Sequence, residues 1–208
     1  HVATLAAPPI YLEHYGLYTN PARAMLIKKL KDANESIELL DLSSHLVRLR
    51  MIKQPAELGA IQAAIDITID ALKDATKPAK LAKYAYEYEL EAELTRGFRK
   101  RGAAGHAFEP IVASGVRACT LHNVANSGAF ASDELVVCDV GSEVEHYAAD
   151  ITRTFALSQP SKRQQAMYSA VLEVQEYAKS LLKPGVLLKE YEQQGEQFMG
   201  EKLRELGL

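Results

Sequence analysis

Residues 135–155 read Leu-Val-Val-Cys-Asp-Val-Gly-Ser-Glu-Val-Glu-His-Tyr-Ala-Ala-Asp-Ile-Thr-Arg-Thr-Phe, and this stretch decides the fold. The first run is apolar and β-branched, which predicts a buried strand that ends near Asp139, and a second strand begins at Asp150. The polar residues between the two runs predict a turn centred on Val144 and Glu145. In a hairpin with that centre, the two aspartates lie directly opposite each other.

The predicted pairing brings two carboxylates together on one face of the sheet. Directly paired residues in a hairpin have Cβ atoms about 4.5–5.5 Å apart, and two buried carboxylates at that distance repel unless a proton or a cation lies between them. One such aspartate alone is ordinarily a turn or cap residue, whereas two in register favour a metal site or a carboxylate dyad. Oxygen-rich ligation with some imidazole suits manganese, cobalt, zinc or iron rather than a thiolate zinc site.

Three further residues are candidates near this pair. His122 follows Cys119-Thr-Leu at the end of a predicted strand. A lone histidine is more often an ordinary surface or core residue, but near a metal pair it is suited to donate a hydrogen bond to a substrate oxygen. Thr152 and Arg153 follow the second aspartate, and they are either plain strand residues or groups that hold a carboxylate ligand in place.

The composition is that of an ordinary globular protein and excludes several classes. The 208 residues are 48% hydrophobic and 25% charged, and 24 basic and 27 acidic residues give a net charge of −3. The sequence has no long basic run and no apolar stretch of membrane-spanning length, so neither nucleic acid nor a membrane is an expected partner. Cys119 and Cys138 each stand beside apolar residues, from which we expect buried free thiols and a cytoplasmic location.

Helical and extended patterns follow one another in blocks along the chain. Residues 1–20 are predicted to be irregular or strand-like, residues 37–42 to form a strand, and residues 108–157 to have β character. Five helices are predicted, from a capping signal or from apolar residues at intervals of three or four: residues 21–33, 58–72, 86–98, 167–181 and 191–206. In residues 51–208, helices precede and follow the strands, which predicts an α+β fold rather than a doubly wound sheet.

Residues 139–155, Asp139-Val-Gly-Ser-Glu-Val-Glu-His-Tyr-Ala-Ala-Asp150-Ile-Thr-Arg-Thr-Phe, resemble the metal-binding hairpin of the pita-bread (creatinase/aminopeptidase, M24-type) metallopeptidases. The resemblance is strongest to Xaa-Pro aminopeptidases and Xaa-Pro dipeptidases. It implies that residues 51–208 form the truncated first part of a pita-bread catalytic domain, and that residues 1–50 are the C-terminal remnant of a small N-terminal α/β domain. Supporting stretches are Met51-Ile-Lys-Gln-Pro-Ala-Glu-Leu, Ile111-Val-Ala-Ser-Gly and Thr120-Leu-His122-Asn.

The resemblance implies a dimetal peptidase. Asp139 and Asp150 would be two of five metal ligands, and His122 would support the tetrahedral intermediate. Two divalent ions, manganese first and cobalt, zinc or iron as alternatives, would polarise the scissile carbonyl. The substrate would be a peptide with proline at its second position, which is Xaa-Pro aminopeptidase activity. The alternatives are a Xaa-Pro dipeptidase (prolidase), a non-catalytic pita-bread binding protein and a metal-free hydrolase of creatinase type.

Part of the expected site lies outside these residues. The family's remaining ligands, one histidine and two glutamates, would follow Leu208, and residues 156–208 contain no histidine. Because the chain begins at His1 rather than methionine and stops after a helical pattern, we expect a fragment of a longer protein that is inactive alone. Apolar helix faces left exposed in a partial chain favour association, so a homo-oligomer is an expected form.

Overall fold

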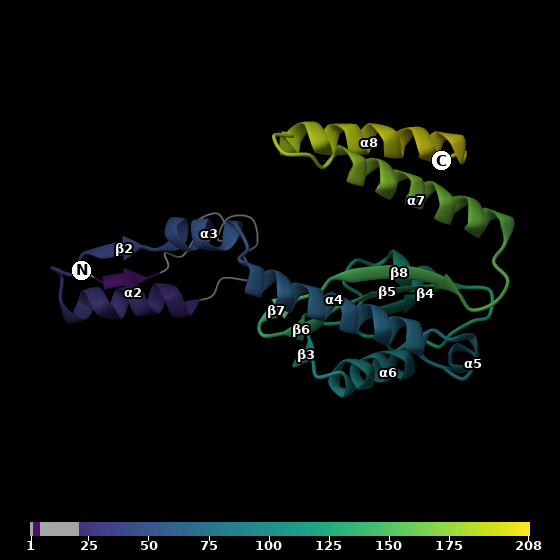
Figure 1. Ribbon diagram of the computed structural model, residues 1–208, viewed down its shortest axis with the longest axis horizontal. Coiled ribbons are helices and arrows are strands. Elements are labelled where there is room, and N and C mark those ends of the chain that lie inside the picture. The colour runs from purple at the N-terminus through teal and green to yellow at the C-terminus, as the bar shows by residue number, and fades with distance from the viewer. Residues whose placement is uncertain (1, 5–20) are drawn as a thin grey trace. The chain divides into compact units, whose positions relative to one another are not determined.

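The computed structural model describes residues 2–4 and 21–208, with side chains from residue 24 onward (Figure 1). The chain divides into two compact units, residues 1–58 and residues 59–208, and each unit is described by itself. The domain boundary at residues 50 and 51 stays a prediction. The prediction of irregular or strand-like structure for residues 5–20 lies outside the described residues.

The described residues of the first unit form a small parallel sheet and the helices α2 and α3. β1 (Val2–Thr4) pairs in parallel with β2 (Leu39–Asp41), and α2 (Pro21–Ala33) lies between them in the chain. The predicted helix at residues 21–33 is confirmed, and β2 confirms a shorter form of the predicted strand. Helix α3 (Ser43–Met51) was not predicted, and none of its residues is buried. Its nine residues give an apolar spacing few turns over which to recur.

The second unit has the predicted order of helices, strands and helices. α4 (Pro55–Ala75), α5 (Pro78–Leu81) and α6 (Glu87–Lys100) precede the strands, and α7 (Lys162–Leu181) and α8 (Leu188–Glu205) follow them. The α+β class is therefore confirmed. None of the helices that the structure describes is long and apolar enough to cross a membrane.

Two three-stranded antiparallel sheets are built from the middle of the chain. One sheet has the strand order β4–β5–β8, and the other has the order β3–β6–β7. Their bounds are β3 Gly105–His106, β4 Ile111–Ser114, β5 Leu135–Val140, β6 Ser142–Val144, β7 Tyr147–Ala148 and β8 Ile151–Ala156. The chain runs from β5 directly into β6 and returns from β7 into β8, so one long hairpin contributes strands to both sheets.

The hydrophobic core is formed by helices α4 and α6 and the β4–β5–β8 sheet (Figure 1). Alternate residues of β5 face this core because a strand has a side-chain period of two, and positions four apart on α6 share one helix face. Burial of each large apolar side chain stabilises the fold by about 1.5–3 kcal/mol. The fully buried members from the two elements are Val136, Cys138, Val140, Leu90, Leu94 and Phe98.

The two cysteines differ in exposure, although both are free. Cys138 is buried in β5, and burial raises the pKa of its thiol. Cys119 is exposed, so the expectation that both thiols are buried was wrong for this residue. The reason is that the chain after β4 winds into the 3-10 helix Gly115–Cys119 instead of continuing as a buried strand.

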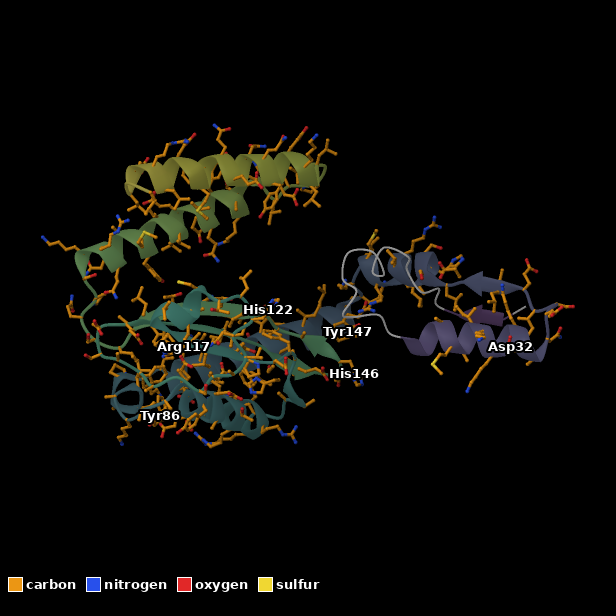
Figure 2. The ribbon with its side chains drawn as sticks, turned by 180° about the vertical axis from the view of Figure 1, so that it is seen from behind. Asp32, Tyr86, Arg117, His122, His146 and Tyr147 are labelled. Carbon is orange, nitrogen blue, oxygen red and sulfur yellow. The ribbon has the colours of Figure 1, made fainter. Side chains whose placement is uncertain are left out.

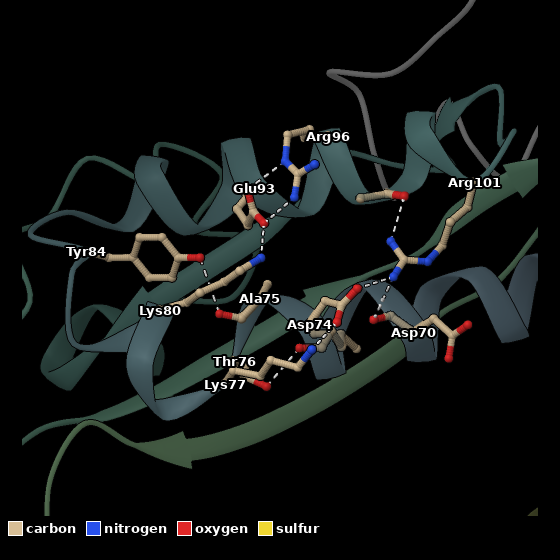
Figure 3. A network of polar contacts seen from close by, with 12 residues as sticks. Asp70, Asp74, Ala75, Thr76, Lys77, Lys80, Tyr84, Glu93, Arg96 and Arg101 are labelled. Atoms are coloured by element: carbon tan, nitrogen blue, oxygen red, sulfur yellow. Dashed lines mark hydrogen bonds and ion pairs between the residues drawn. The ribbon is translucent and has the colours of Figure 1, made fainter.

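Charged side chains join α4, α5 and α6 in the network of Figure 3. On α6, Glu93 accepts hydrogen bonds from Arg96 at 2.6 Å and from Lys80 of α5. On α4, Asp74 pairs with Arg101, which follows α6. The Arg96 and Lys80 hydrogen bonds hold the pKa of Glu93 down at about 2. The network therefore fastens the short α5 segment to the helix that forms one side of the core.

Replacing Glu93 with glutamine is expected to destabilise the fold more at neutral pH than at pH 2.5. A carboxyl whose folded-state pKa lies below its ordinary value stabilises the protein above that ordinary value, and the stabilisation disappears as pH falls toward about 2. Because Lys80 and Arg96 are partly exposed, we expect a loss of only about 1 kcal/mol at pH 7. Urea denaturation at pH 7 and at pH 2.5 measures the difference.

A matched control removes a simpler ion pair. Glu176 pairs with Lys179 on the exposed surface of α7 at 3.0 Å. We expect Glu176→Gln to change the free energy of unfolding by less than about 0.5 kcal/mol at either pH. An equal loss for Glu93→Gln at both pH values would show that packing, and not charge, is responsible.

Candidate metal centre

The turn of the aspartate hairpin lies one residue further along the chain than predicted. Glu145 and His146 join β6 to β7 with φ angles of 49° and 66°, and Val144 pairs with Tyr147. A two-residue turn with positive φ at both central positions is the type I′ turn, whose twist matches that of antiparallel strands. The predicted centre at Val144 and Glu145 was therefore wrong, and the hairpin is displaced by one residue at its tip.

This turn shifts the strand register by two residues. Asp139 pairs with Thr152, and Val140 pairs with Ile151. The prediction that Asp139 and Asp150 lie directly opposite each other was therefore wrong. Because side chains alternate between the two faces of a sheet, a shift of two residues keeps both aspartates on one face as diagonal neighbours.

The two carboxyl groups still interact. The side chain of Asp139 is half-buried, and that of Asp150 reaches solvent. Burial raises the pKa of Asp150, and the charge of Asp139 and a side-chain hydrogen bond with it raise the pKa further. Repulsion between two neighbouring carboxylates is relieved either by a shared proton or by a cation. The pair is therefore a carboxylate site whose chemistry suits a divalent metal ion.

The two residues predicted to support the ligands lie on opposite faces of β8. The Thr152 hydroxyl donates a hydrogen bond of 2.9 Å to Oδ1 of Asp139. Arg153 pairs with Cys138 in the register, and its guanidinium donates to the backbone carbonyl of Thr152 at 2.8 Å. Thr152 thus touches a candidate ligand directly, whereas Arg153 touches only the backbone beside it. Their roles in metal binding stay predictions.

His122 lies in a surface turn rather than at the end of a strand. β4 ends at Ser114, the 3-10 helix follows, and His122 is exposed with a φ of 55° (Figure 2). The predicted strand leading to it was wrong, because Gly115 at a φ of 55° turns the chain out of β4. Within residues 21–208, no hydrogen bond or ion pair joins His122 to either aspartate, and its catalytic role stays a prediction.

The described part of the chain supplies two candidate ligands to the site. Over residues 2–4 and 21–208, no group of three or more histidine, cysteine, aspartate or glutamate side chains gathers as a possible cation site. Two carboxylates fit the oxygen ligation of a divalent metal ion, but four or more ligands are usual for such ions.

Sequence reasoning missed a buried carboxylate beside the loop that carries His122. Glu87, the first residue of α6, is fully buried and accepts hydrogen bonds from Ser114, Arg117 and Gly128. A signal was present in the sequence, because Glu87 occupies the apolar stripe of α6, three residues before Leu90. A charged residue on such a stripe is buried only when it is paired.

Comparison with known proteins places these features in a family. Residues 59–208 match the family model of metallopeptidase family M24. The chain is 32% identical over 165 residues to a Xaa-Pro dipeptidase of Pyrococcus furiosus, an alignment that covers 79% of this chain and 47% of the relative. It is 34% identical over 176 residues to a Xaa-Pro aminopeptidase of Haemophilus influenzae, covering 82% of this chain and 40% of the relative.

Solved structures give the same result. An X-Pro aminopeptidase from Thermotoga maritima superimposes with a TM-score of 0.77 at 31% identity, over 86% of this chain and 50% of that one. The aminopeptidase PepP of Pseudomonas aeruginosa superimposes with a TM-score of 0.79 at 30% identity, over 92% of this chain and 45% of that one. The fold is therefore part of the pita-bread fold of these aminopeptidases.

The α+β fold and the aspartate hairpin together define a metallopeptidase scaffold. The chain belongs to metallopeptidase family M24. It spans half the length, or somewhat less, of the relatives that it matches.

Proposed function

We propose that the complete gene product is a metal-dependent exopeptidase that hydrolyses the bond between an N-terminal residue and proline. The observation that carries the proposal is the pair Asp139 and Asp150, diagonal neighbours on one face of the hairpin in a chain of a metallopeptidase family. Burial, and then the charge of Asp139, raise the pKa of Asp150. Relatives named Xaa-Pro aminopeptidase and Xaa-Pro dipeptidase support the substrate class.

Each candidate residue has a distinct proposed task. Asp139 and Asp150 hold two divalent metal ions, proposed to be manganese, and Thr152 fixes the orientation of Asp139 through its hydroxyl. When bound, the metal ions supply Lewis-acid polarisation of the scissile carbonyl and a water of lowered pKa. His122 donates a hydrogen bond to the oxygen on which negative charge develops. Arg153 steadies the β8 backbone next to Thr152.

Proline explains why a dedicated site is needed. The nitrogen of an X–Pro bond carries no hydrogen, and so it offers no N–H donor to a peptide-binding site. Recognition must therefore come from the ring, from the free amino terminus and from the carbonyl. We propose that the substrate is a peptide with proline at its second position, and that aminopeptidase activity on longer peptides predominates.

A peptide series tests this proposal. The complete gene product, supplied with Mn(II), is incubated with alanyl-proline, alanyl-prolyl-alanine and trialanine, and the products are identified by mass spectrometry. We expect release of alanine from alanyl-prolyl-alanine and no cleavage of trialanine. Cleavage of the dipeptide alone would favour a Xaa-Pro dipeptidase, the alternative that the Pyrococcus relative supports. Absence of cleavage of both proline peptides would contradict the proposal.

Residues 1–208 by themselves are proposed to be inactive. Two carboxylates cannot complete the coordination of two divalent ions, each of which takes four or more ligands. The same peptide assay on the purified 208-residue chain measures this. Robust turnover with Mn(II) that disappears on Asp150→Asn substitution would contradict it.

Compartment and assembly belong to the same proposal. Both cysteines are free, which suits a reducing cytoplasm. Large apolar side chains remain exposed on α7 and α8, among them Val171, Leu172 and Leu188, and exposed apolar surface favours association. We propose a cytoplasmic homo-oligomer, which light scattering on the complete gene product can test.

Replacing Thr152 with valine is expected to weaken metal binding by roughly 10–100-fold, because groups that orient a ligand typically contribute that much to affinity. The substitution keeps the shape of the side chain and removes the hydroxyl that donates to Asp139. Calorimetric titration with Mn(II) measures the change. Thr152→Ser should restore affinity, and Thr154→Val, two residues along β8, should leave it unchanged. Equal weakening by both valine substitutions would contradict the assigned role.

A further inference from the structure

We infer that Glu87 and Arg117 are positioning residues that fix the loop carrying His122, here called the His122 loop and defined as residues 115–128. The inference deepens the proposed function, since it rests on the proposed hydrogen bond from His122 to the substrate. Its observations are nonetheless independent of the aspartate pair, because they concern α6, β4 and the two ends of this loop.

Glu87 closes the base of the His122 loop. It is fully buried at the start of α6. Its Oε1 accepts a hydrogen bond from the backbone N–H of Ser114, just before the loop, at 2.8 Å. Its Oε2 accepts from the backbone N–H of Gly128, the last loop residue, at 2.8 Å. One carboxylate therefore holds both ends of a fourteen-residue segment (115–128) at a single point.

Arg117 extends this closure into the loop. Its Nε donates to Oε1 of Glu87 at 2.7 Å, and its Nη2 donates to Oγ of Ser114 at 2.6 Å and to the carbonyl of Ala129 at 2.9 Å. The guanidinium lies so close to Gly128 that a Cβ on this glycine would stand 2.0 Å from Nε. The planar guanidinium group is thus packed between the two ends of the loop. The ammonium group of a lysine could not make the same set of hydrogen bonds there.

The charge state of Glu87 fits this role. Burial by itself would raise the pKa of Glu87, but the hydrogen bonds from Arg117, Ser114 and Gly128 outweigh it and hold the pKa below its ordinary value. The carboxylate therefore stays charged beside the guanidinium. A buried carboxylate of this kind depends on its partners, since the loss of one leaves a charge without compensation.

Asn126 anchors the returning part of the same loop. It is buried with a φ of 44°. Its Oδ1 accepts from the backbone N–H of Val112 at 2.8 Å, and its Nδ2 donates to Glu91 at 2.9 Å and to the carbonyl of Pro110 at 2.8 Å. The loop is therefore tied to both β4 and α6.

His122 stands between these anchors in a backbone conformation that needs support. Its φ of 55° is in the left-handed region, which is unfavourable for a residue with a Cβ. Such a conformation persists when the surrounding structure determines it. The exposed imidazole makes none of the anchoring contacts itself, so its position follows from the loop that Glu87 and Arg117 hold.

A displaced hydrogen-bond donor loses much of its effect on the transition state. Misplacement of a catalytic group by about 1 Å lowers rates by roughly 100-fold. Loosening the loop should therefore lower kcat while leaving KM and metal content nearly unchanged, because neither aspartate lies in this loop.

The experiment is a double-mutant cycle in the complete, Mn(II)-supplied gene product with alanyl-prolyl-alanine as substrate. Arg117→Lys keeps the positive charge but removes the planar guanidinium group, and we expect kcat to fall by roughly 10–100-fold. In a His122→Ala background, the same substitution should have little further effect, because Arg117 acts through His122. The matched control is Arg96→Gln, which removes an exposed arginine that pairs with Glu93 on the same helix and should leave kcat unchanged.

Hydrogen exchange supplies a readout that does not depend on activity. In Arg117→Lys and Glu87→Gln, amides of residues 115–128 should exchange at least about tenfold faster than in the wild type, while those of β5 keep their protection. Loss of protection in β5 as well would mark general unfolding and would overturn the inference. So would an equal fall in kcat with and without His122, or unchanged exchange in the loop. An inactive wild-type protein would instead overturn the proposed function. The hydrogen-exchange rates of residues 115–128 would still decide whether Glu87 and Arg117 fix the loop.

Discussion

Asp150→Asn is expected to lower X–Pro hydrolysis by at least about 1,000-fold, which corresponds to about 4 kcal/mol of transition-state stabilisation. Asparagine has nearly the same shape as aspartate but carries no negative charge. The variant removes the carboxylate that neighbours Asp139 and whose pKa is raised by burial and by that neighbour. A metal site that loses one of its charged oxygen ligands no longer holds two cations in place. Initial rates on alanyl-prolyl-alanine at saturating Mn(II) measure the effect.

The control for this variant removes the same charge elsewhere in the second unit. Asp133 is exposed in the turn before β5, and Asp133→Asn should change the rate by less than about twofold, as expected for a surface substitution. Circular dichroism should show that both variants are folded. A folded Asp150→Asn protein that retains a tenth or more of the wild-type rate would remove Asp150 from the site.

Gly141→Ala is expected to destabilise the fold by about 3 kcal/mol or more, at the upper end of what overpacking costs. A Cβ on Gly141 would lie 1.7 Å from the carbonyl oxygen of Ala149. That carbonyl cannot move away easily, because hydrogen bonds from Ala149 N to Ser142 O and from Ala107 N to Gly141 O hold the local backbone. Asp150 follows Ala149 directly, so the variant should weaken Mn(II) binding as well. Urea denaturation followed by circular dichroism measures the stability.

For a second glycine, Gly195, we expect replacement by alanine to stabilise the fold rather than destabilise it. Gly195 lies in α8, and a Cβ added there would meet no side chain and no other segment within 4 Å. Alanine is the better helix former, so Gly195→Ala should stabilise the protein by about 0.5–1 kcal/mol. If Gly141→Ala were as stable as wild type, the close approach of the two hairpin strands would not be a constraint of the fold.

Helix α6 could be predicted because its apolar spacing marks the face that it buries. Leu90, Leu94 and Phe98 recur every four residues, and all three are fully buried in the core. Helix α3 was not predicted, because its nine residues are too few for an apolar spacing to recur over several turns. Strand β5 was also predictable, since residues 135–138 form an apolar, β-branched run.

The register of the hairpin could not be predicted from the sequence. Its turn residues, Glu145 and His146, adopt positive φ without the glycine or asparagine that usually marks a type I′ turn. Without that marker, the polar stretch between the strands allowed a centre one residue away. The error in the turn position changed only the strand register, since the displaced pairing still brings Asp139 and Asp150 into contact.

The hydrogen bonds that close the His122 loop could not be predicted from the sequence, for a different reason. Glu87 and Arg117 are thirty residues apart, and their hydrogen bond depends on how α6 and β4 meet in the folded chain. Sequence spacing reports neighbours within one helix or strand, but it does not report pairs that the tertiary fold creates. The one local signal was a glutamate on the apolar stripe of α6.

Metal stoichiometry tests the central claim most directly. The complete gene product and its Asp139→Asn/Asp150→Asn variant are dialysed against Mn(II), freed of excess metal, and analysed for metal per chain by mass spectrometry. We predict about two metal ions per wild-type chain, as expected for a two-metal hydrolytic site, and a loss of both in the folded variant. A variant that retains two ions per chain, or a fully active wild type that binds none, would contradict the assignment of Asp139 and Asp150 as metal ligands.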